Sequence, residues 1–229
     1  MADQHPLAFG LEKVASTEGP DAMLTLLTRM SPGDDRRSLS QSLTRRLATT
    51  AGSDILESHL LPWARALPSS QSPFVEAAIA VGLARHSPTR AADILRGIEP
   101  HPSGALGSQW SDIAFEWGDN DPQGASAYFS ANSNAIPASA FRTLAYRWLE
   151  NDPAAASIWV SQMPRSDRKD AAIGSIIGHL TGRSADAADF QTALAWSAEI
   201  VDPAQASKAA ESTLIRWRKT DPNTAPKLP

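Results

Sequence analysis

Cysteine is absent from this chain of 229 residues. Its absence excludes disulfide bonds, thiolate zinc sites, iron–sulfur clusters and a cysteine nucleophile. Long apolar runs are missing too. No segment approaches the about eighteen residues that a membrane-spanning helix needs, so we expect no membrane insertion. The first nine residues lack a basic segment followed by an apolar one, so we expect either a cytoplasmic protein or an exported one whose leader has been removed.

Familiar catalytic motifs are also missing. The sequence has no Gly-rich phosphate loop, no HExxH motif and no GxSxG elbow, and its five histidines share no ligand spacing. One segment resembles the start of a calcium loop, with Asp119, Asp121, Gln123 and Gly124. Ser130 stands where such a loop needs a bidentate Glu, so we interpret the segment as a helix cap. The sequence therefore predicts no catalytic residue, no cofactor and no metal site.

Excess positive charge is lacking as well. The net charge is −4, and the middle of the chain, residues 101–163, has six acidic residues against Arg142 and Arg147. A protein that binds nucleic acid needs a cationic surface to displace counterions. We therefore expect no nucleic-acid partner, and we expect the acidic middle to favour basic or neutral partners through long-range attraction.

The clearest positive feature is an internal repeat. Residues 114–122 read AFEWGDNDP, residues 145–153 read AYRWLENDP, and residues 214–222 read LIRWRKTDP. In each copy, Trp is followed by Asp at the fourth position and Pro at the fifth. A second anchor alternates with this one at spacings of 31 to 37 residues: Leu27, Trp63, Leu95, Tyr128, Trp159 and Trp196. Registered copies of this kind indicate a repeat architecture.

Helix starts follow from the Asp-Pro and Ser-Pro pairs. The Asp or Ser oxygen caps free backbone N–H groups, and Pro at the first helical position has no N–H to lose. Asp202 with Gln205 also matches a capping box, and Pro62 should kink or split its helix. With apolar residues recurring every three or four positions, these signals predict helices over residues 6–17, 20–30, 35–49, 53–67, 72–85, 88–98, 104–118, 122–132, 137–150, 153–163, 166–180, 185–200 and 203–219.

These elements predict an all-α fold, a right-handed αα-superhelix (solenoid) of about six two-helix repeats of 31–37 residues. We interpret residues 1–220 as a single helical-repeat domain and residues 221–229 as a Pro-rich C-terminal tail. The architecture resembles bacterial αα-hairpin repeat proteins, the class of tetratricopeptide-like and HEAT-like superhelices. The resemblance covers nearly the whole chain. It brings no site residues with it, because the tetratricopeptide signature of Trp, Leu-Gly and Tyr is absent.

Candidate binding residues come from two clusters. Trp110 is the one Trp outside the two repeat anchors, and Asp112 and Glu116 follow it on the same predicted helix. Anchor aromatics mostly pack between stacked helices, whereas Trp110 fits core packing and an exposed stacking surface equally well. Arg36 and Arg37 belong to a basic patch, which is either a solvated face offset by neighbouring acidic residues or a contact for an acidic partner. These five residues are the predicted partner-binding positions.

The fold class favours a non-catalytic binding or scaffolding module that presents a concave helical surface to a protein or peptide partner. One alternative is a small all-helical carbohydrate-active enzyme, which would use Asp112 and Glu116 as paired carboxylates beside Trp110. Another is a structural assembly or envelope component. Terminal repeats normally need a polar outer face, so we also expect possible homo-oligomers through the last repeat.

Overall fold

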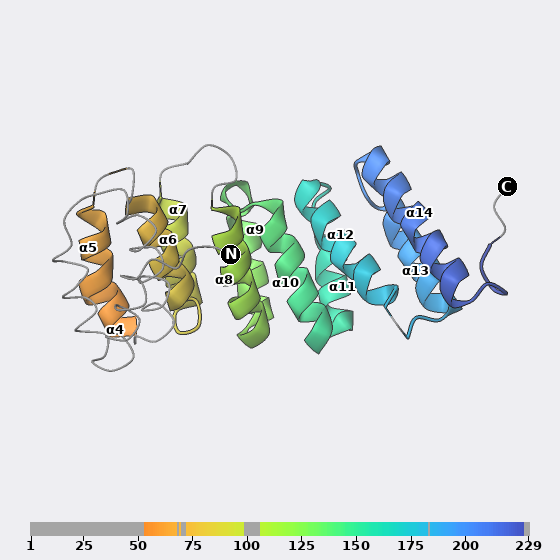
Figure 1. The fold of residues 1–229 in the computed structure, drawn as a ribbon, viewed down its shortest axis with the longest axis horizontal. Coiled ribbons are helices and arrows are strands. Elements are labelled where there is room, and N and C mark those ends of the chain that lie inside the picture. Colours follow the sequence, from red (N-terminus) through yellow and green to blue (C-terminus); the bar gives the residue numbers. More distant parts are fainter. Residues whose placement is uncertain (1–52, 68, 70–71, 99–105, 183, 227–229) are drawn as a thin grey trace, which may run out of the picture. The chain divides into compact units, whose positions relative to one another are not determined.

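The computed structural model describes residues 53–67, 69, 72–98, 106–182 and 184–226. These residues form about ten packed helices and contain no strand (Figure 1), which confirms the all-α prediction. The chain divides into two compact units, Met1–Gln109 and Trp110–Pro229, and each is described by itself. The helices predicted before residue 53 lie outside the described residues, as do Arg36 and Arg37. The right-handed superhelix and the single domain over residues 1–220 stay predictions.

The first unit contains a helix with an altered turn at Pro62. The segment runs from α4 (Ser53–Ile55) through the π-helical turn η1 (Leu56–Leu60) into α5 (Leu61–Arg65). The hydrogen-bond pattern changes directly before Pro62, where proline removes a backbone donor. The backbone stays in the right-handed helical region at Leu60 and Leu61, so the expected kink or split appears here only as a change of hydrogen-bond pattern. Two further helices, which pack against each other, complete the described part of this unit: α6 (Ser72–Leu83) and α7 (Pro88–Gly97).

The second unit is a packed array of helices. Helix α10 packs against α12, α12 against α13, and α13 against α14. Figure 1 shows α8, α10 and α12 side by side, with α9 and α11 behind them. The helices of this unit are α8 (Gly107–Asn120), α9 (Pro122–Ala131), α10 (Ala138–Asn151), α11 (Pro153–Gln162), α12 (Asp167–Leu180), α13 (Ala187–Ala198) and α14 (Pro203–Thr220), with a short 3-10 turn η2 (Ser133–Ala135).

The Asp-Pro helix starts form as predicted. The carboxylate of Asp121 accepts a hydrogen bond from the backbone N–H of Gly124 at 2.9 Å. Asp152 accepts the equivalent bond from the N–H of Ala155 at 3.0 Å. Both caps satisfy a donor that the first helical turn leaves unpaired. Ser87 begins α7 without a side-chain cap, so the Ser-Pro signal gives the helix boundary there but not the bond.

The capping box lies at a different helix start from the one expected. At the start of α14, Asp202 accepts from the backbone N–H groups of Ala204 and Gln205. The Gln205 side chain, however, donates to the Asp202 carboxylate and does not accept from the Asp202 backbone N–H, which donates to Asp170 instead. A full box forms at α13, where Asp186 and Asp189 each accept from the other's backbone N–H. A carboxylate at this third helical position therefore completes the box.

The Trp residues of the first repeat anchor are buried. Trp117, Trp148 and Trp217 are 4%, 5% and 2% exposed. Trp159 and Trp196 of the second anchor are half-buried and pack against the core that α10, α12 and α13 share. Both anchors therefore fill space between helices, as expected for aromatic residues in repeat register.

Candidate binding face of α8 and α10

Exposed apolar side chains recur at one position of the repeat. In the described part of the chain the large exposed apolar residues are Phe115, Tyr146, Ile158, Val201 and Ile215. Three of them lie two residues before the buried Trp of their helix: Phe115 in α8, Tyr146 in α10 and Ile215 in α14. Their exposed fractions are 42%, 50% and 58%. We call these three residues the apolar set.

Helix geometry explains why the apolar set faces solvent. Residues two positions apart on an α-helix point about 200° apart, because each residue turns the chain by about 100°. Burial of Trp117 and Trp148 between helices therefore turns Phe115 and Tyr146 outward. The repeat keeps an apolar residue at a position that its own packing leaves uncovered.

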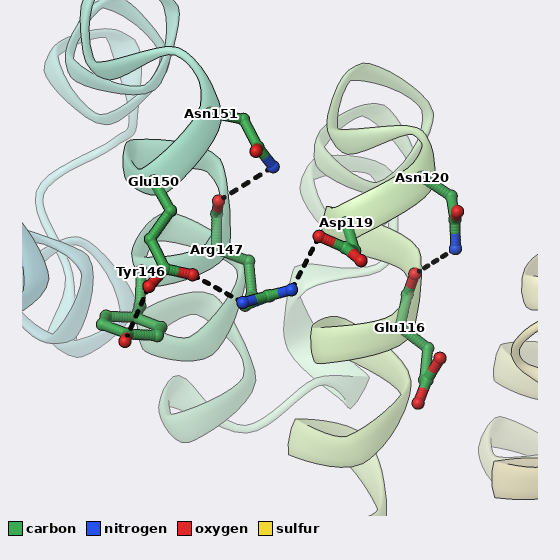
Figure 2. A network of polar contacts seen from close by, with 7 residues as sticks. All are labelled: Glu116, Asp119, Asn120, Tyr146, Arg147, Glu150 and Asn151. Atoms are coloured by element: carbon green, nitrogen blue, oxygen red, sulfur yellow. Dashed lines mark hydrogen bonds and ion pairs between the residues drawn. The ribbon is translucent and has the colours of Figure 1, made fainter.

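Arg147 connects the exposed residues of α8 and α10 (Figure 2). Its guanidinium donates to Asp119 of α8 at 2.6 Å and to Glu150 of α10 at 2.5 Å. The hydroxyl of Tyr146 donates to the same Glu150 carboxylate at 2.9 Å. The central carbon of the guanidinium also lies 4.0 Å from the centroid of the Phe115 ring. Arg147 therefore contacts Phe115 directly and is connected to Tyr146 through their shared partner Glu150.

The network orients side chains more than it stabilises the fold. The Arg147 side chain is 19% exposed, but its partners Asp119 and Glu150 are 50% and 39% exposed. Ion pairs in contact with water contribute about 0–1 kcal/mol each, and an exposed cation–π contact adds about 0.5–1 kcal/mol. The larger consequence is that Phe115 and Tyr146 are held in place before any contact forms, which lowers the ordering cost of binding.

The hydrogen bond at Tyr146 also changes its acidity. The bond from the hydroxyl to Glu150, together with the negative charge of that carboxylate, raises the pKa of Tyr146 above its ordinary value of 10.0. Removing the phenol proton would break the bond and place two negative charges side by side. Tyr146 therefore stays a neutral hydrogen-bond donor throughout the neutral pH range.

A glycine lets α8 approach α10 closely enough for this network. A Cβ atom on Gly118 would lie 2.9 Å from the Leu144 side chain and 3.3 Å from Cβ of Arg147. Real side chains rarely come so close, and Leu144 is fully buried. The small residue after Trp117 therefore sets the separation that Arg147 spans.

The charge of this face is negative. Helices α8 and α10 carry four carboxylates and two guanidinium groups, which leaves a net charge of −2. These residues are Asp112, Glu116, Asp119, Arg142, Arg147 and Glu150. Half of the acidic excess predicted for residues 101–163, −2 of −4, thus lies on the same helices as two members of the apolar set.

The predicted site residues differ in their exposure to solvent. Asp112 is exposed and Glu116 is half-buried, both on α8. Trp110 is only 5% exposed, and its ring meets the edge of Phe129 with centroids 6.3 Å apart. This burial favours the packing interpretation of Trp110. Arg36 and Arg37 lie outside the described residues.

Sequence reasoning did not select Phe115, Tyr146, Arg147 or Glu150. A signal was present, because AFEW and AYRW both place an aromatic residue two positions before Trp. Combined with the prediction that the anchor Trp is buried, that spacing identifies an exposed aromatic position. The ion pair between Arg147 and Asp119 joins two helices, so residue spacing along the chain does not predict it.

Within the described ranges, no three His, Asp or Glu side chains lie close enough together to hold a metal ion, and no helix is both long and apolar enough to cross a membrane. Comparisons with protein-family models, with curated proteins and with solved structures found no match to this chain.

Proposed function

We propose that the chain is a non-catalytic binding or scaffolding module that takes a protein or peptide partner on the face of α8 and α10. The observation that supports this proposal is the apolar set, which places Phe115, Tyr146 and Ile215 at one exposed repeat position. Single exposed apolar residues are common on protein surfaces. Packing of the anchor Trp accounts for the exposure of this repeat position but not for its recurrent apolar character, because a side chain turned away from the core does not need to be apolar.

The chemistry of the face favours a basic partner with apolar side chains. Phe115 and Tyr146 supply aromatic contact area, and tyrosine and arginine are enriched where binding energy is concentrated. The net charge of −2 on α8 and α10 attracts lysine and arginine from a distance and disfavours acidic partners. We infer a peptide segment in which basic residues flank one or two large apolar ones.

The sugar-binding alternative depends on Trp110. Stacking of a sugar ring requires an exposed aromatic face beside the carboxylates Asp112 and Glu116. Trp110 is 5% exposed and packs against Phe129. This cluster therefore offers that alternative no support.

The test is selection of peptides from a random display library on the purified chain. Recovered sequences should be enriched in Lys and Arg next to aromatic or branched apolar residues. Their affinity, measured by calorimetry, should fall about tenfold or more in the double variant Phe115→Ala/Tyr146→Ala, as expected when two aromatic anchors are removed.

A matched control removes the same kind of exposed surface elsewhere. The variant Ile158→Ala/Val201→Ala truncates side chains that are 58% and 44% exposed and lie outside the repeat position of the apolar set. It should bind the selected peptides like the parent chain. Acidic or purely polar selected sequences, equal losses in both double variants, or no enrichment at all would contradict the proposal.

A further inference from the structure

A pocket opens among α11, α12 and α13, away from the residues of the α8–α10 face. Its volume is about 430 Å³, within the range of roughly 300–1,000 Å³ typical of small-molecule sites. Three helices supply its lining, which consists of Ser161, Lys169, Thr192, Ala195, Trp196 and Glu199. The pocket therefore combines an aromatic surface, a hydroxyl group, a cation and a carboxylate.

The buried cation is the unusual member of this lining. The Lys169 side chain is 6% exposed, whereas Glu199 is 57% exposed. The Lys169 ammonium donates to the backbone carbonyl of Ser161 at 3.2 Å, and a Glu199 oxygen lies 3.7 Å away. An ammonium group has three N–H donors, and within the described residues these two oxygens are its polar contacts. At least one donor is left for an acceptor in the pocket.

The repeat supplies an internal comparison for this position. At the 31-residue spacing that separates Trp117 from Trp148, Lys169 of α12 corresponds to Ala138 of α10. The second anchor pairs Trp196 with Trp159 and, three residues later, Glu199 with Gln162. The preceding hairpin thus keeps the Trp but has alanine and glutamine where the pocket has lysine and glutamate.

This comparison shows that the fold of a hairpin does not require the lysine. Burial of an ammonium group carries a desolvation cost of several kcal/mol unless its donors are satisfied. Alanine at the equivalent position of α10 avoids that cost completely. The anion beside this buried cation, Glu199, is 57% exposed and lies at 3.7 Å, so the ammonium can take a closer anion from the open pocket.

We propose that this pocket binds a small organic carboxylate with an apolar or aromatic body. The ligand carboxylate accepts a hydrogen bond from the Lys169 ammonium, and its body lies against Trp196. The Thr192 hydroxyl lines the pocket but already donates to the backbone carbonyl of Ala188 at 2.9 Å. Glu199 is mostly exposed and holds the ammonium only at 3.7 Å, so the ligand displaces it toward solvent. The proposal concerns a different site from the α8–α10 face and does not depend on the function proposed for that face.

The experiment is a titration with phenylacetate, followed through the indole N–H signals of the ¹⁵N-labelled chain. The Trp196 signal, assigned with Trp196→Phe, should shift saturably. Lys169→Gln should weaken binding at least about tenfold, as expected for loss of a charged hydrogen bond. Glu199→Gln should tighten binding about fivefold, because the ligand carboxylate then no longer has to displace a competing carboxylate about 4 Å from the ammonium.

Two controls separate a binding site from a structural contact. Lys208→Gln removes an exposed lysine of α14 that does not line the pocket, and it should leave the affinity unchanged. Benzyl alcohol has a similar body without the charge and should bind at least about tenfold more weakly. If Lys169→Gln unfolds the chain, Glu199→Gln still decides the matter. No shift of Trp196 up to about 10 mM phenylacetate, equal binding of the alcohol, or weaker binding in Glu199→Gln would overturn the proposal.

Discussion

Phe129 is the central residue of the aromatic core in the second unit. Its side chain is fully buried, and its ring meets those of Trp110, Trp117 and Phe141 edge-on, with centroid distances of 6.3, 6.3 and 5.4 Å. We expect Phe129→Ala to lower the free energy of unfolding by about 3–5 kcal/mol, because it removes a large side chain from a close-packed core. Urea denaturation measures this loss. Ile158→Ala, at a position 58% exposed, should change stability by less than about 0.5 kcal/mol, and similar losses in both variants would contradict the assignment of the core.

Tyr146 provides a pH-dependent reading of the α8–α10 network. The folded state holds the phenol proton more tightly than the unfolded chain, because the hydrogen bond and the charge of Glu150 raise the pKa of Tyr146 above 10.0. The stability contributed by this bond is full below pH 10.0 and is lost as pH rises through the folded-state pKa. Titration of the ¹³C-labelled tyrosine rings should show the high pKa, and Glu150→Gln should lower it toward the ordinary value. An unchanged pKa in that variant would contradict the observed hydrogen bond.

The substitution Gly124→Ala tests whether one copy of the repeat predicts which residue another copy accepts at the equivalent position. A Cβ atom placed there would lie 2.0 Å from the Asp121 carboxylate, yet the equivalent cap between Asp152 and Ala155 forms with an alanine. In the variant Gly124→Ala we expect the Asp121 side chain to rotate into the conformation with which Asp152 caps its helix beside Ala155. The variant should then gain up to about 1 kcal/mol in unfolding free energy, since alanine is a better helix former than glycine. Thermal or urea unfolding measures the change. A loss of stability would show that the two caps are not equivalent.

At the scale of helices, the sequence predicted what is local. The spacing of Asp, Pro and apolar residues predicted α9, α11 and α14 closely, because capping and amphipathic periodicity act within one helix. The prediction of a capping box at the start of α14 was wrong, because the Gln205 side chain donates to the Asp202 carboxylate. The candidate site was predicted only where it lies on one helix, at Asp112 and Glu116. Arg147 was not predicted, because its role depends on how closely α10 approaches α8.

The start of α14 shows a long-range cap of the kind that sequence spacing does not reveal. Asp170 of α12 is 7% exposed, and its carboxylate accepts from the backbone N–H groups of Val201 at 2.9 Å and Asp202 at 3.2 Å. We expect Asp170→Ala to cost about 2–3 kcal/mol of unfolding free energy, because it leaves two N–H groups without their acceptor. Faster hydrogen exchange at Val201 and Asp202 should accompany the loss.

Asp186→Ala is the control for that prediction. Asp186 caps its own helix from an exposed position, so its loss should cost about 1 kcal/mol and leave exchange at Val201 unchanged. Equal costs for the two variants would contradict a role for Asp170 in docking α14 onto α12.

At the scale of the whole molecule, repetition explains both the core and the proposed binding face. A buried Trp at one repeat position forces the residue two positions earlier outward, so each copy that keeps the Trp also exposes a side chain. The chain uses that outward position for Phe115, Tyr146 and Ile215.

Charge then decides how the face responds to salt. Helices α8 and α10 carry a net charge of −2, and the screening distance falls from about 10 Å at 0.1 M to about 3 Å at 1 M ionic strength. Each unscreened contact between opposite charges about 4 Å apart is worth about 1 kcal/mol in water. We therefore expect a basic peptide selected on this face to bind about tenfold more weakly at the higher ionic strength.

Asp112→Asn separates this electrostatic part from the apolar part of the affinity. Asp112 is exposed on α8, and the variant reduces the net negative charge of the two helices from −2 to −1 without altering the Arg147 network. Its salt dependence, measured by calorimetry over the same range, should be about half that of the parent chain. The affinity that persists at high salt should still fall in Phe115→Ala/Tyr146→Ala, because burial of aromatic surface is not screened by ions. Binding that strengthens with salt in the parent chain, or an unchanged salt dependence in Asp112→Asn, would mean that the acidic face does not attract the partner.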